Sequence, residues 1–508
     1  MPLPKGQPSQ MEHEAPGNDH FDWHKKKVSV RDMDNLSTGP RTSSSRMSFA
    51  GQEQVRKIGE GKPQALNQPR WPYFLVLLSL LFEFGRPQEA IPGLGAIPFP
   101  TMIDALIFLA VLGSGKMSFA NTQTKLWLPL LALMALHVPI AVNNYWALMT
   151  LKSMVLLFSL YLGIIIFVNS WARIQTLVTV WLGVHVVLAV MGIMNGGRGV
   201  GGWLGDENDF CMEMNMVVPF AFFMFQMPTK RTKKIVYMTM LGLFVLTAMV
   251  TLSRGGFIGL ASVGLYCWLR SSQKLRAVLL VGILVIFMLL LAPAKYWEEV
   301  GSITDDKTID TGTGAERFYT WGIGLDMFLS NPIIGVGQEN FPWTLQKYEV
   351  EKRFNTRSFA GRAAHSMYFQ LFPELGLVGA GILGAMLYYT RRDLRMVDRF
   401  SRSYREASGT SEEESEQIRS AFYYARAMEA SMIGYLVSSV FISTLYYPSF
   451  WVMMAFSVAL RNVILGDKTV PMLKWSPVLR QPQNLFRPLG PLPGRGLSSP
   501  DIPGLKNQ

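Results

Sequence analysis

The sequence predicts an all-α polytopic membrane protein with about twelve transmembrane helices and one large external loop. Of its 508 residues, 49% are hydrophobic and only 17% are charged, whereas soluble proteins carry about 25% charged residues. The hydrophobic residues gather in long runs between residues 71 and 465, and many runs approach the ~20 residues that cross a bilayer. Lys and Arg cluster in alternate short loops, as they do in chains that cross a membrane repeatedly.

Polar tails flank the hydrophobic part of the chain. Residues 1–70 are rich in Ser, Gly, Pro and Gln and have no apolar periodicity, so we expect a disordered cytoplasmic N-terminal tail. They contain no apolar h-region of the kind that marks a signal peptide. Residues 466–508 are rich in Pro and basic residues and predict a second cytoplasmic tail. Basic residues in both tails could contact anionic headgroups.

Twelve apolar segments make up the predicted membrane domain, residues 71–465. They lie at 71–85, 99–114, 125–142, 147–168, 173–194, 210–227, 234–252, 254–270, 276–293, 366–390, 423–446 and 449–465. Several are shorter than a perpendicular span requires. The first two could instead form a shallow hairpin, because four prolines interrupt them, at positions 87, 92, 98 and 100.

The distribution of basic residues predicts the orientation. Clusters of Lys and Arg occupy residues 230–234, 270–276 and 391–395. The alternate loops carry a single Arg each, namely Arg86, Arg198 and Arg254. Because Lys and Arg concentrate in cytoplasmic loops, this pattern places both termini in the cytoplasm. Residues 294–365 then form the large external loop.

Composition also excludes several function classes. The net charge of +12 would favour nucleic acid in a soluble protein, but here the basic residues lie beside apolar segments and we predict no nucleic-acid partner. The only two cysteines, Cys211 and Cys267, lie inside apolar runs and predict neither a disulfide framework nor a zinc site. The glycines at 197, 199 and 202 match a dinucleotide fingerprint formally, but no βαβ pattern surrounds them.

An acidic group follows these glycines. Asp206, Glu207 and Asp209 fit a solvated loop as well as a divalent-ion site. The sequence therefore predicts neither a resident metal nor a cofactor.

Three residues on the predicted external side carry potential chemistry. Arg254 lies in a tight turn between two apolar segments, where it either snorkels outward and caps a helix or clamps a phosphate with its planar fork. His365 lies where the external loop meets the span 366–390 and is either a structural hydrogen-bonding residue or a general base. Arg317, taken alone, indicates a surface charge beside an aromatic cluster.

Several motifs of the sequence together resemble those of a known family. His365 and Ser366, followed after nine residues by Gly376 and then by Gly379, resemble the His-[Asn/Ser/Gln]-x9-Gly-x-x-Gly signature of bacterial O-antigen ligases and related polysaccharide polymerases. The stretch 253–256 (Ser-Arg-Gly-Gly) resembles the Ser-Arg turn of that family.

Further blocks resemble the family in the same order. They are 316–321 (Glu-Arg-x-x-x-Trp), 331–337 (Asn-Pro-Ile-Ile-Gly-Val-Gly) and Phe341. The resemblance covers residues 200–390 closely and 71–465 in general topology, and the two tails have no counterpart.

The resemblance implies a glycosyltransferase of the bacterial inner membrane that acts at the periplasmic face. The donor would be a glycan on undecaprenyl pyrophosphate, and the acceptor would be a hydroxyl of a glycan, a lipid core or a protein. The product would be O-antigen, lipopolysaccharide or another surface polysaccharide. The family reaction inverts the sugar C1 and uses no metal. Membrane lipids and other polysaccharide-assembly proteins are the remaining expected partners.

The resemblance also assigns roles to residues. It makes His365 the base that deprotonates the acceptor hydroxyl, and it makes Arg254 and Arg317 the groups that bind the pyrophosphate. Arg198, Ser366 and Tyr368 are further candidates for substrate contact. The helix face that carries Tyr368, with the neighbouring rings at 369 and 372, either lines a groove for the polyprenyl chain or packs against other helices.

Several alternatives remain open. No external-loop arginine has a glycine eleven positions later, and this absence of an Arg-x10-Gly pattern seen in some polymerases favours a ligase over a polymerase. An exopolysaccharide or protein O-glycosylating enzyme of the same family fits the same residues. A twelve-span transporter or a flippase for lipid-linked glycans is the alternative from another class.

Overall fold

The computed structural model describes residues 70–117, 119, 121–271, 273–275, 278, 282, 313–349, 359–406 and 412–466. All of them belong to one compact unit, Pro63–Gln508. The predicted tails, nearly all of the predicted span 276–293 and residues 294–312 and 350–358 of the predicted loop lie outside the described residues.

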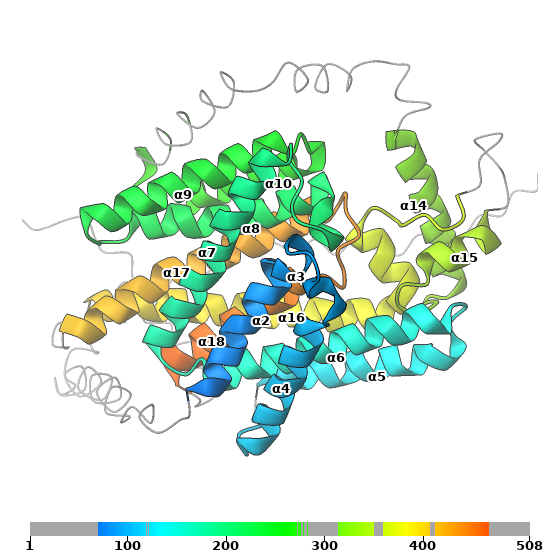
Figure 1. Cartoon of the computed structure of the whole chain (residues 1–508), viewed down its shortest axis with the longest axis horizontal. Helices are drawn as coiled ribbons and strands as arrows, with labels where there is room; N and C mark the ends of the chain where they lie inside the picture. Colours follow the sequence, from blue (N-terminus) through cyan, green and yellow to red (C-terminus); the bar gives the residue numbers. More distant parts are fainter. Residues whose placement is uncertain are drawn as a thin grey trace, which may run out of the picture. The chain divides into compact units, whose positions relative to one another are not determined.

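Every regular element in these ranges is helical (Figure 1). The elements are α2 (Trp71–Phe84), α3 (Pro87–Ala90), η3 (Leu94–Ala96), α4 (Phe99–Gly113), α5 (Thr122–Ile140), α6 (Asn144–Phe167), α7 (Trp171–Met194), η4 (Gly202–Gly205), α8 (Glu207–Gln226), α9 (Arg231–Val250), α10 (Arg254–Arg270), α14 (Thr313–Ser330), α15 (Phe341–Tyr348), α16 (Met367–Glu406), α17 (Glu412–Ser438) and α18 (Pro448–Leu465). The predicted all-α class is confirmed for the described part of the chain.

Helices stand at eleven of the twelve predicted span positions, but fewer of them have the length and composition of a span. Six are long and apolar enough to cross a membrane: α5, α6, α7, α9, the first 37 residues of α16, and α18. Helices α2 and α4 have 14 and 15 residues, which at 1.5 Å per residue reach about 21–23 Å of a ~30 Å hydrocarbon core. This length fits the shallow-hairpin alternative, and the total of twelve spans stays a prediction.

Side-chain caps explain where several helices begin. Asn121, Asn143, Ser170, Asp206 and Ser253 each accept a hydrogen bond from a backbone N–H of the first turn that follows. These residue types favour the N-cap position because their short side chains satisfy donors that have no partner inside the helix. The caps at 206 and 253 fix the starts of α8 and α10, which matter for the site below.

Helix α8 forms the centre of one group of helices. All of its residues from Asp209 to Met224 are buried, as expected for a mostly apolar helix that other helices surround. It packs against α9, α10 and α17, and Figure 1 shows α17 running beside it. Neighbouring helices expose large apolar residues such as Val187 and Leu265, which fits a lipid-facing surface.

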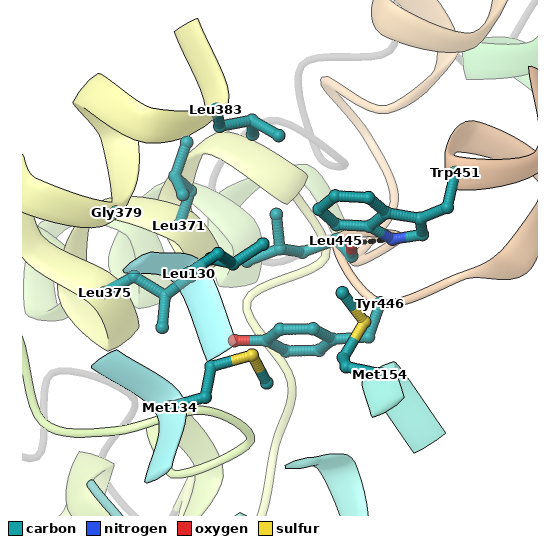
Figure 2. A pocket seen from close by; sticks show the side chains of 10 residues that line it. All are labelled: Leu130, Met134, Met154, Leu371, Leu375, Gly379, Leu383, Leu445, Tyr446 and Trp451. Carbon is teal, nitrogen blue, oxygen red and sulfur yellow. Dashed lines mark hydrogen bonds between the residues drawn. The ribbon is translucent and has the colours of Figure 1, made fainter. Parts of the chain in front are cut away.

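The interior of a second group of helices is closely packed. Between α5, α6, α16 and α18 lies a cavity of about 10 Å³, close to the minimum that holds one water molecule. Figure 2 shows it framed by Leu371, Leu375, Gly379 and Leu383 at four-residue steps along α16, with Tyr446 opposite. No charged side chain lines it, so this part of the interior is core rather than a binding site.

An ion-pair network marks one end of the bundle, which we call the network end. Two acidic residues, Asp398 on α16 and Glu429 on α17, are buried there. Their ion-pair partners are Arg270, Arg391, Arg395, Arg402 and Arg426, at 2.5 to 4.0 Å. Arg270 ends α10 and Arg254 begins it, so the two guanidinium-bearing positions are about 24 Å apart along the helix axis.

Candidate active site

Two helix N-termini lie side by side at the end of the bundle opposite to the network. We call this end the site end. Asp206 caps α8 and Ser253 caps α10. The two starts are joined directly, because the Ser253 hydroxyl donates to Asn208 Oδ1 at 2.7 Å. Arg254 follows as the first residue of α10 and is exposed. Helix N-termini carry partial positive charge and unsatisfied N–H groups, so this pairing with an arginine favours an anion.

The other two predicted catalytic residues come to the same place from distant parts of the chain. Arg317 lies in the first turns of α14, and His365 lies two residues before the start of α16 at Met367. Asp206 is close enough to both for its charge to raise their pKa values. The pKa of Arg317 is lowered, first by desolvation and then by the charge of Arg254, which acts against Asp206. The predicted trio therefore forms one cluster around Asp206.

The surroundings of His365 favour its neutral form. The side chain is exposed, yet neighbouring atoms reduce its hydration, and this desolvation is the main reason why its pKa is lowered. Arg317 and Arg362 lower this pKa further, while Asp206 and Glu316 oppose them. An imidazole with a pKa below its ordinary value of about 6.5 is unprotonated at neutral pH and can accept a proton.

Arg198 lies at the edge of this cluster. It is exposed and pairs with Glu207, with Arg198 Nη2 2.7 Å from Glu207 Oε1. The carboxylates of Glu207 and Asp206 both raise its pKa. Asp206 therefore acts on Arg198 as well as on Arg317 and His365, which makes it the shared counter-charge of the site end.

Ser366 and Tyr368 make contacts within the fold. Ser366 is buried, and its hydroxyl accepts the N–H of Phe369 at 3.5 Å in the first turn of α16. Tyr368 is half-buried, and its hydroxyl donates to the carbonyl of Leu436 on α17 at 3.0 Å. These contacts give both residues a part in orienting the start of α16, and with it His365.

A segment that precedes α15 docks into a break in α16. Gly376 has φ 61° and ψ −163° and interrupts the helix. Residues 331–340, the docked segment, supply partners for the opened backbone. The hydrogen bonds run from Val336 N to Pro373 O at 2.9 Å, from Gly337 N to Glu374 O at 2.9 Å, from Leu377 N to Pro332 O at 2.8 Å and from Val378 N to Ile333 O at 3.0 Å. The Gly-x-x-Gly part of the signature is thus where two distant segments join.

The docked segment also ties α5 to α6. Gln338 is fully buried and donates to the carbonyls of Met134 and Ala147 at 2.8 and 2.9 Å. Its amide oxygen faces His137 Nδ1 at 3.1 Å. The segment is consequently held on both sides, which fixes the position of the residue that follows Gln338.

That residue, Glu339, was not among the predicted site residues. Its backbone N–H donates to Glu374 Oε2 at 2.9 Å, and its carboxylate faces Gln370 Nε2 at 3.4 Å. Glu374 is fully buried and also accepts the N–H of Phe341 and the hydroxyl of Tyr446. Burial raises the pKa of Glu339, and the hydrogen bond from Gln370 acts against that rise.

Backbone strain concentrates around these residues. Among the described residues other than glycine, only Arg86, Leu252, Glu339 and His365 have positive φ, at 49°, 54°, 52° and 48°. Leu252 directly precedes the Ser253 cap, and Arg86 donates to the carbonyl of Gly201 at 2.8 Å. Such conformations cost about 1–3 kcal/mol each and cluster at functional sites. The positions of these four residues therefore indicate a functional site at the site end.

The three acidic residues at 206, 207 and 209 each contact a different partner. Asp206 caps α8, Glu207 pairs with Arg198, and Asp209 accepts the hydroxyl of Tyr447 at 2.9 Å. Within the part of the chain that the structure describes, no group of three or more His, Cys, Asp or Glu could hold a metal ion. The glycines at 197 and 199 lie in the loop between α7 and η4, Gly202 begins η4, and all three follow a helix rather than a strand.

A cavity of about 410 Å³ lies beside the docked segment. Apolar side chains of Ile140, Val142 and Ile333 line it together with Lys347. Its size falls in the range of ligand sites, and its mixed lining suits a lipid chain with an anionic group.

Comparison with known protein families gives a match. Residues 238–384 match a family model described as O-antigen ligase. The matched stretch runs from α9 to the first half of α16 and contains Arg254, Arg317 and His365. Among curated proteins, none matches the chain. Residues 238–384 are therefore similar to an O-antigen ligase domain.

Proposed function

We propose that this protein is a membrane glycosyltransferase that transfers a glycan from undecaprenyl pyrophosphate to a hydroxyl acceptor at the external face of the bacterial inner membrane. The observation that carries the proposal is the cluster of Arg254, Arg317 and His365 at two adjacent helix N-termini. The family match over the segment that contains all three residues supports it.

The two arginines suit the pyrophosphate. Arg254 and Arg317 are close enough for Arg254 to lower the pKa of Arg317, so an anion bound between them would offset the repulsion between the two like charges. A pyrophosphate relieves this repulsion and accepts the fork-like donors of both side chains. As the bond between C1 and the phosphate oxygen breaks, negative charge grows on that oxygen, and the arginines stabilise it. Losing one such donor typically costs about 10²–10³-fold in rate.

His365 supplies the base. Its neutral imidazole takes the proton of the acceptor hydroxyl while the hydroxyl oxygen attacks C1 from the side opposite to the phosphate. The C1 configuration therefore inverts, the proton ends on His365, and the pyrophosphate leaves with the electron pair of the broken bond. General-base catalysis of this kind contributes about 10²–10⁴-fold.

The orientation follows from the two ends of the bundle. The network end carries the arginines at 270, 391, 395, 402 and 426, and the positive-inside rule assigns it to the cytoplasm. The site end then faces the periplasm, where flipped lipid-linked glycans are available. The cavity beside the docked segment is a candidate place for a lipid chain.

Transfer by the purified chain in lipid vesicles, with an undecaprenyl-pyrophosphate glycan as donor, tests the catalytic roles. His365→Asn is the sharpest variant, because Asn tolerates positive φ but cannot act as a base. We expect its transfer rate to fall at least about 100-fold. Arg254→Lys should also fail, because it keeps the charge and loses the fork. Arg402→Lys at the network end is the matched control. Normal transfer by His365→Asn would refute the base assignment.

A deletion strain distinguishes the members of the family. Loss of all glycan on the lipid core, with polymerised lipid-linked glycan accumulating, identifies a ligase, which we favour. Single repeat units on the core, or loss of a free exopolysaccharide, identify a polymerase. An unchanged surface-glycan gel would count against the family activity and favour the transporter or flippase alternative.

A further inference from the structure

Three arginines at the network end share one carboxylate. Glu429 Oε1 lies 3.5 Å from Arg391 Nε and 3.6 Å from Arg395 Nε, and Glu429 Oε2 lies 3.4 Å from Arg270 Nη2. The hydroxyl of Tyr266 also donates to Oε2, at 2.6 Å. Arg391 and Arg395 lie four residues apart on α16, a spacing at which like charges repel. A single carboxylate cannot neutralise three guanidinium groups, so positive charge is left over.

The neighbouring acid does not supply the missing negative charge. Asp398 already pairs with two cations, Arg402 at 2.5 Å and the buried Arg426 at 3.1 Å. The side chains of Arg391 and Arg395 are 63% and 41% exposed, and within the described part of the chain their ion-pair partner is Glu429, which they approach through Nε. A guanidinium has five N–H donors. Their terminal Nη groups can therefore bind an anion from outside the protein.

The arginines end an exposed face of α16. Leu377, Gly381, Gly384, Tyr388 and Arg391 follow one another at steps of three or four residues, so they lie on one side of the helix, and all five are exposed. No described atom lies within 4 Å of a Cβ added at either glycine. From Leu377 to Arg391 the face is about 21 Å long, which exceeds the ~15 Å depth of one hydrocarbon leaflet.

We propose that this face of α16 binds an anionic phospholipid of the cytoplasmic leaflet, with its phosphate on Arg391 and Arg395 and an acyl chain along Gly384 and Gly381. Charge complementarity selects the headgroup, because guanidinium forks match phosphate oxygens and the phosphate supplies negative charge that Glu429 alone does not. Tyr388 lies between the arginines and the glycines, where an aromatic ring suits the headgroup level.

The apolar part of the face favours a lipid over a free phosphate ion, which would contact the arginines alone. Basic residues at the cytoplasmic ends of membrane helices attract anionic headgroups for the same reason. The site lies at the end of α16 opposite to His365. It therefore does not depend on the catalytic roles proposed above.

Native mass spectrometry of the full chain in detergent micelles tests the site. The probes are phosphatidylglycerol, with net charge −1, and phosphatidylcholine, with net charge zero, both with the same acyl chains. Each basic residue near an anionic headgroup contributes about fivefold in affinity, so the wild type should bind phosphatidylglycerol at least about tenfold more tightly. Arg391→Gln combined with Arg395→Gln should bring the two affinities within about threefold. This variant should fold, because Glu429 keeps Arg270 and Tyr266.

A matched double variant controls for net charge. Arg231→Gln combined with Lys233→Gln removes two exposed cations from the start of α9 and should bind phosphatidylglycerol as the wild type does. An equal loss of binding in both double variants would show a general effect of charge and overturn the site. Equal affinity of the wild type for the two lipids would overturn it as well.

Two further measurements identify the occupant. Gly384→Leu places a side chain on the path of the acyl chain and should weaken phosphatidylglycerol binding at least about fivefold, while glycerol 3-phosphate should not displace the lipid. Displacement by glycerol 3-phosphate at an equal concentration would identify a phosphate site and overturn the lipid assignment. Light scattering that shows a wild-type dimer and a Gly384→Leu monomer would identify a second copy of the chain as the occupant, which also overturns it.

Discussion

Substitution of Gly376 by Ala tests whether the docked segment shapes the active site. Gly376 combines φ 61° with ψ −163°, a region that is essentially restricted to glycine. An added Cβ would lie 2.4 Å from the carbonyl oxygen of Ile333 and 2.7 Å from the N–H nitrogen of Ile334. Both atoms belong to the backbone of the docked segment, so the clash cannot be relieved by turning a side chain.

The expected cost follows from these contacts. The forbidden backbone conformation costs about 1–3 kcal/mol. Moving Ile333 away breaks the hydrogen bonds of Leu377 to Pro332 and of Val378 to Ile333, and each lost hydrogen bond costs about 0.5–1.5 kcal/mol. The sum is about 2–6 kcal/mol, a large part of the 5–15 kcal/mol that typically stabilises a folded domain.

Gly381→Ala provides the matched control. It lies on the same helix, and no atom lies within 4 Å of its added Cβ, so it should stabilise the helix by about 0.5–1 kcal/mol. Thermal unfolding in detergent, followed by fluorescence-detected size exclusion, should rank Gly381→Ala at or above the wild type and Gly376→Ala far below it. Transfer by Gly376→Ala should be lost even at temperatures where it remains folded. Equal melting temperatures and equal transfer in the two variants would refute the reasoning.

Two further predictions concern electrostatics at opposite ends of the bundle. The transfer rate should fall in acid as His365 becomes protonated. Arg362 lowers the pKa of His365 and Glu316 raises it, so Arg362→Gln should move the acid limb of the pH–rate profile to higher pH and Glu316→Gln should move it to lower pH, each by about half a unit. A pH–rate profile that neither variant shifts would exclude His365 as the titrating base. At the network end, Asp398→Asn removes the carboxylate that pairs with the buried Arg426 at 3.1 Å. This substitution should lower the free energy of unfolding by about 3 kcal/mol and so lower the melting temperature. An unchanged melting temperature would show that this pair is not needed for stability.

The sequence predicts most of the helices because membrane helices are marked by patterns among neighbouring residues. Apolar runs, polar caps such as Ser170 and Ser253, and loop prolines are all properties of neighbouring residues. The predicted span 254–270 coincides with α10 for this reason. The number of spans is harder to predict, because α2 and α4 are apolar like spans but have only 14 and 15 residues, with prolines in the segment between them.

Part of the candidate site could also be named from the sequence, because Arg254 and His365 lie beside apolar segments and the family resemblance singles out Arg317; the roles of all three residues stay predictions. Glu339 and Gln370 could not, because nothing local marks them. Their positions depend on how residues 331–340 dock into the break of α16, and this pairing joins segments that are far apart in the sequence. A clue was available in the unusual run of polar residues after Gly337, which a buried segment accepts only if each group has a partner.

The docked segment has a consequence for how the protein is made. The ends of α5 and α6 receive the side chain of Gln338 from 204 and 191 residues further along the chain. At synthesis rates of about 5–20 residues per second, these helices wait roughly 10–40 s for their partner. During that interval the carbonyls of Met134 and Ala147 lack the donor that they have in the finished protein. We therefore expect early ribosome-bound intermediates to depend on the insertion machinery or a membrane chaperone at this point, and crosslinks from α5 to such factors should disappear once residue 340 has been translocated.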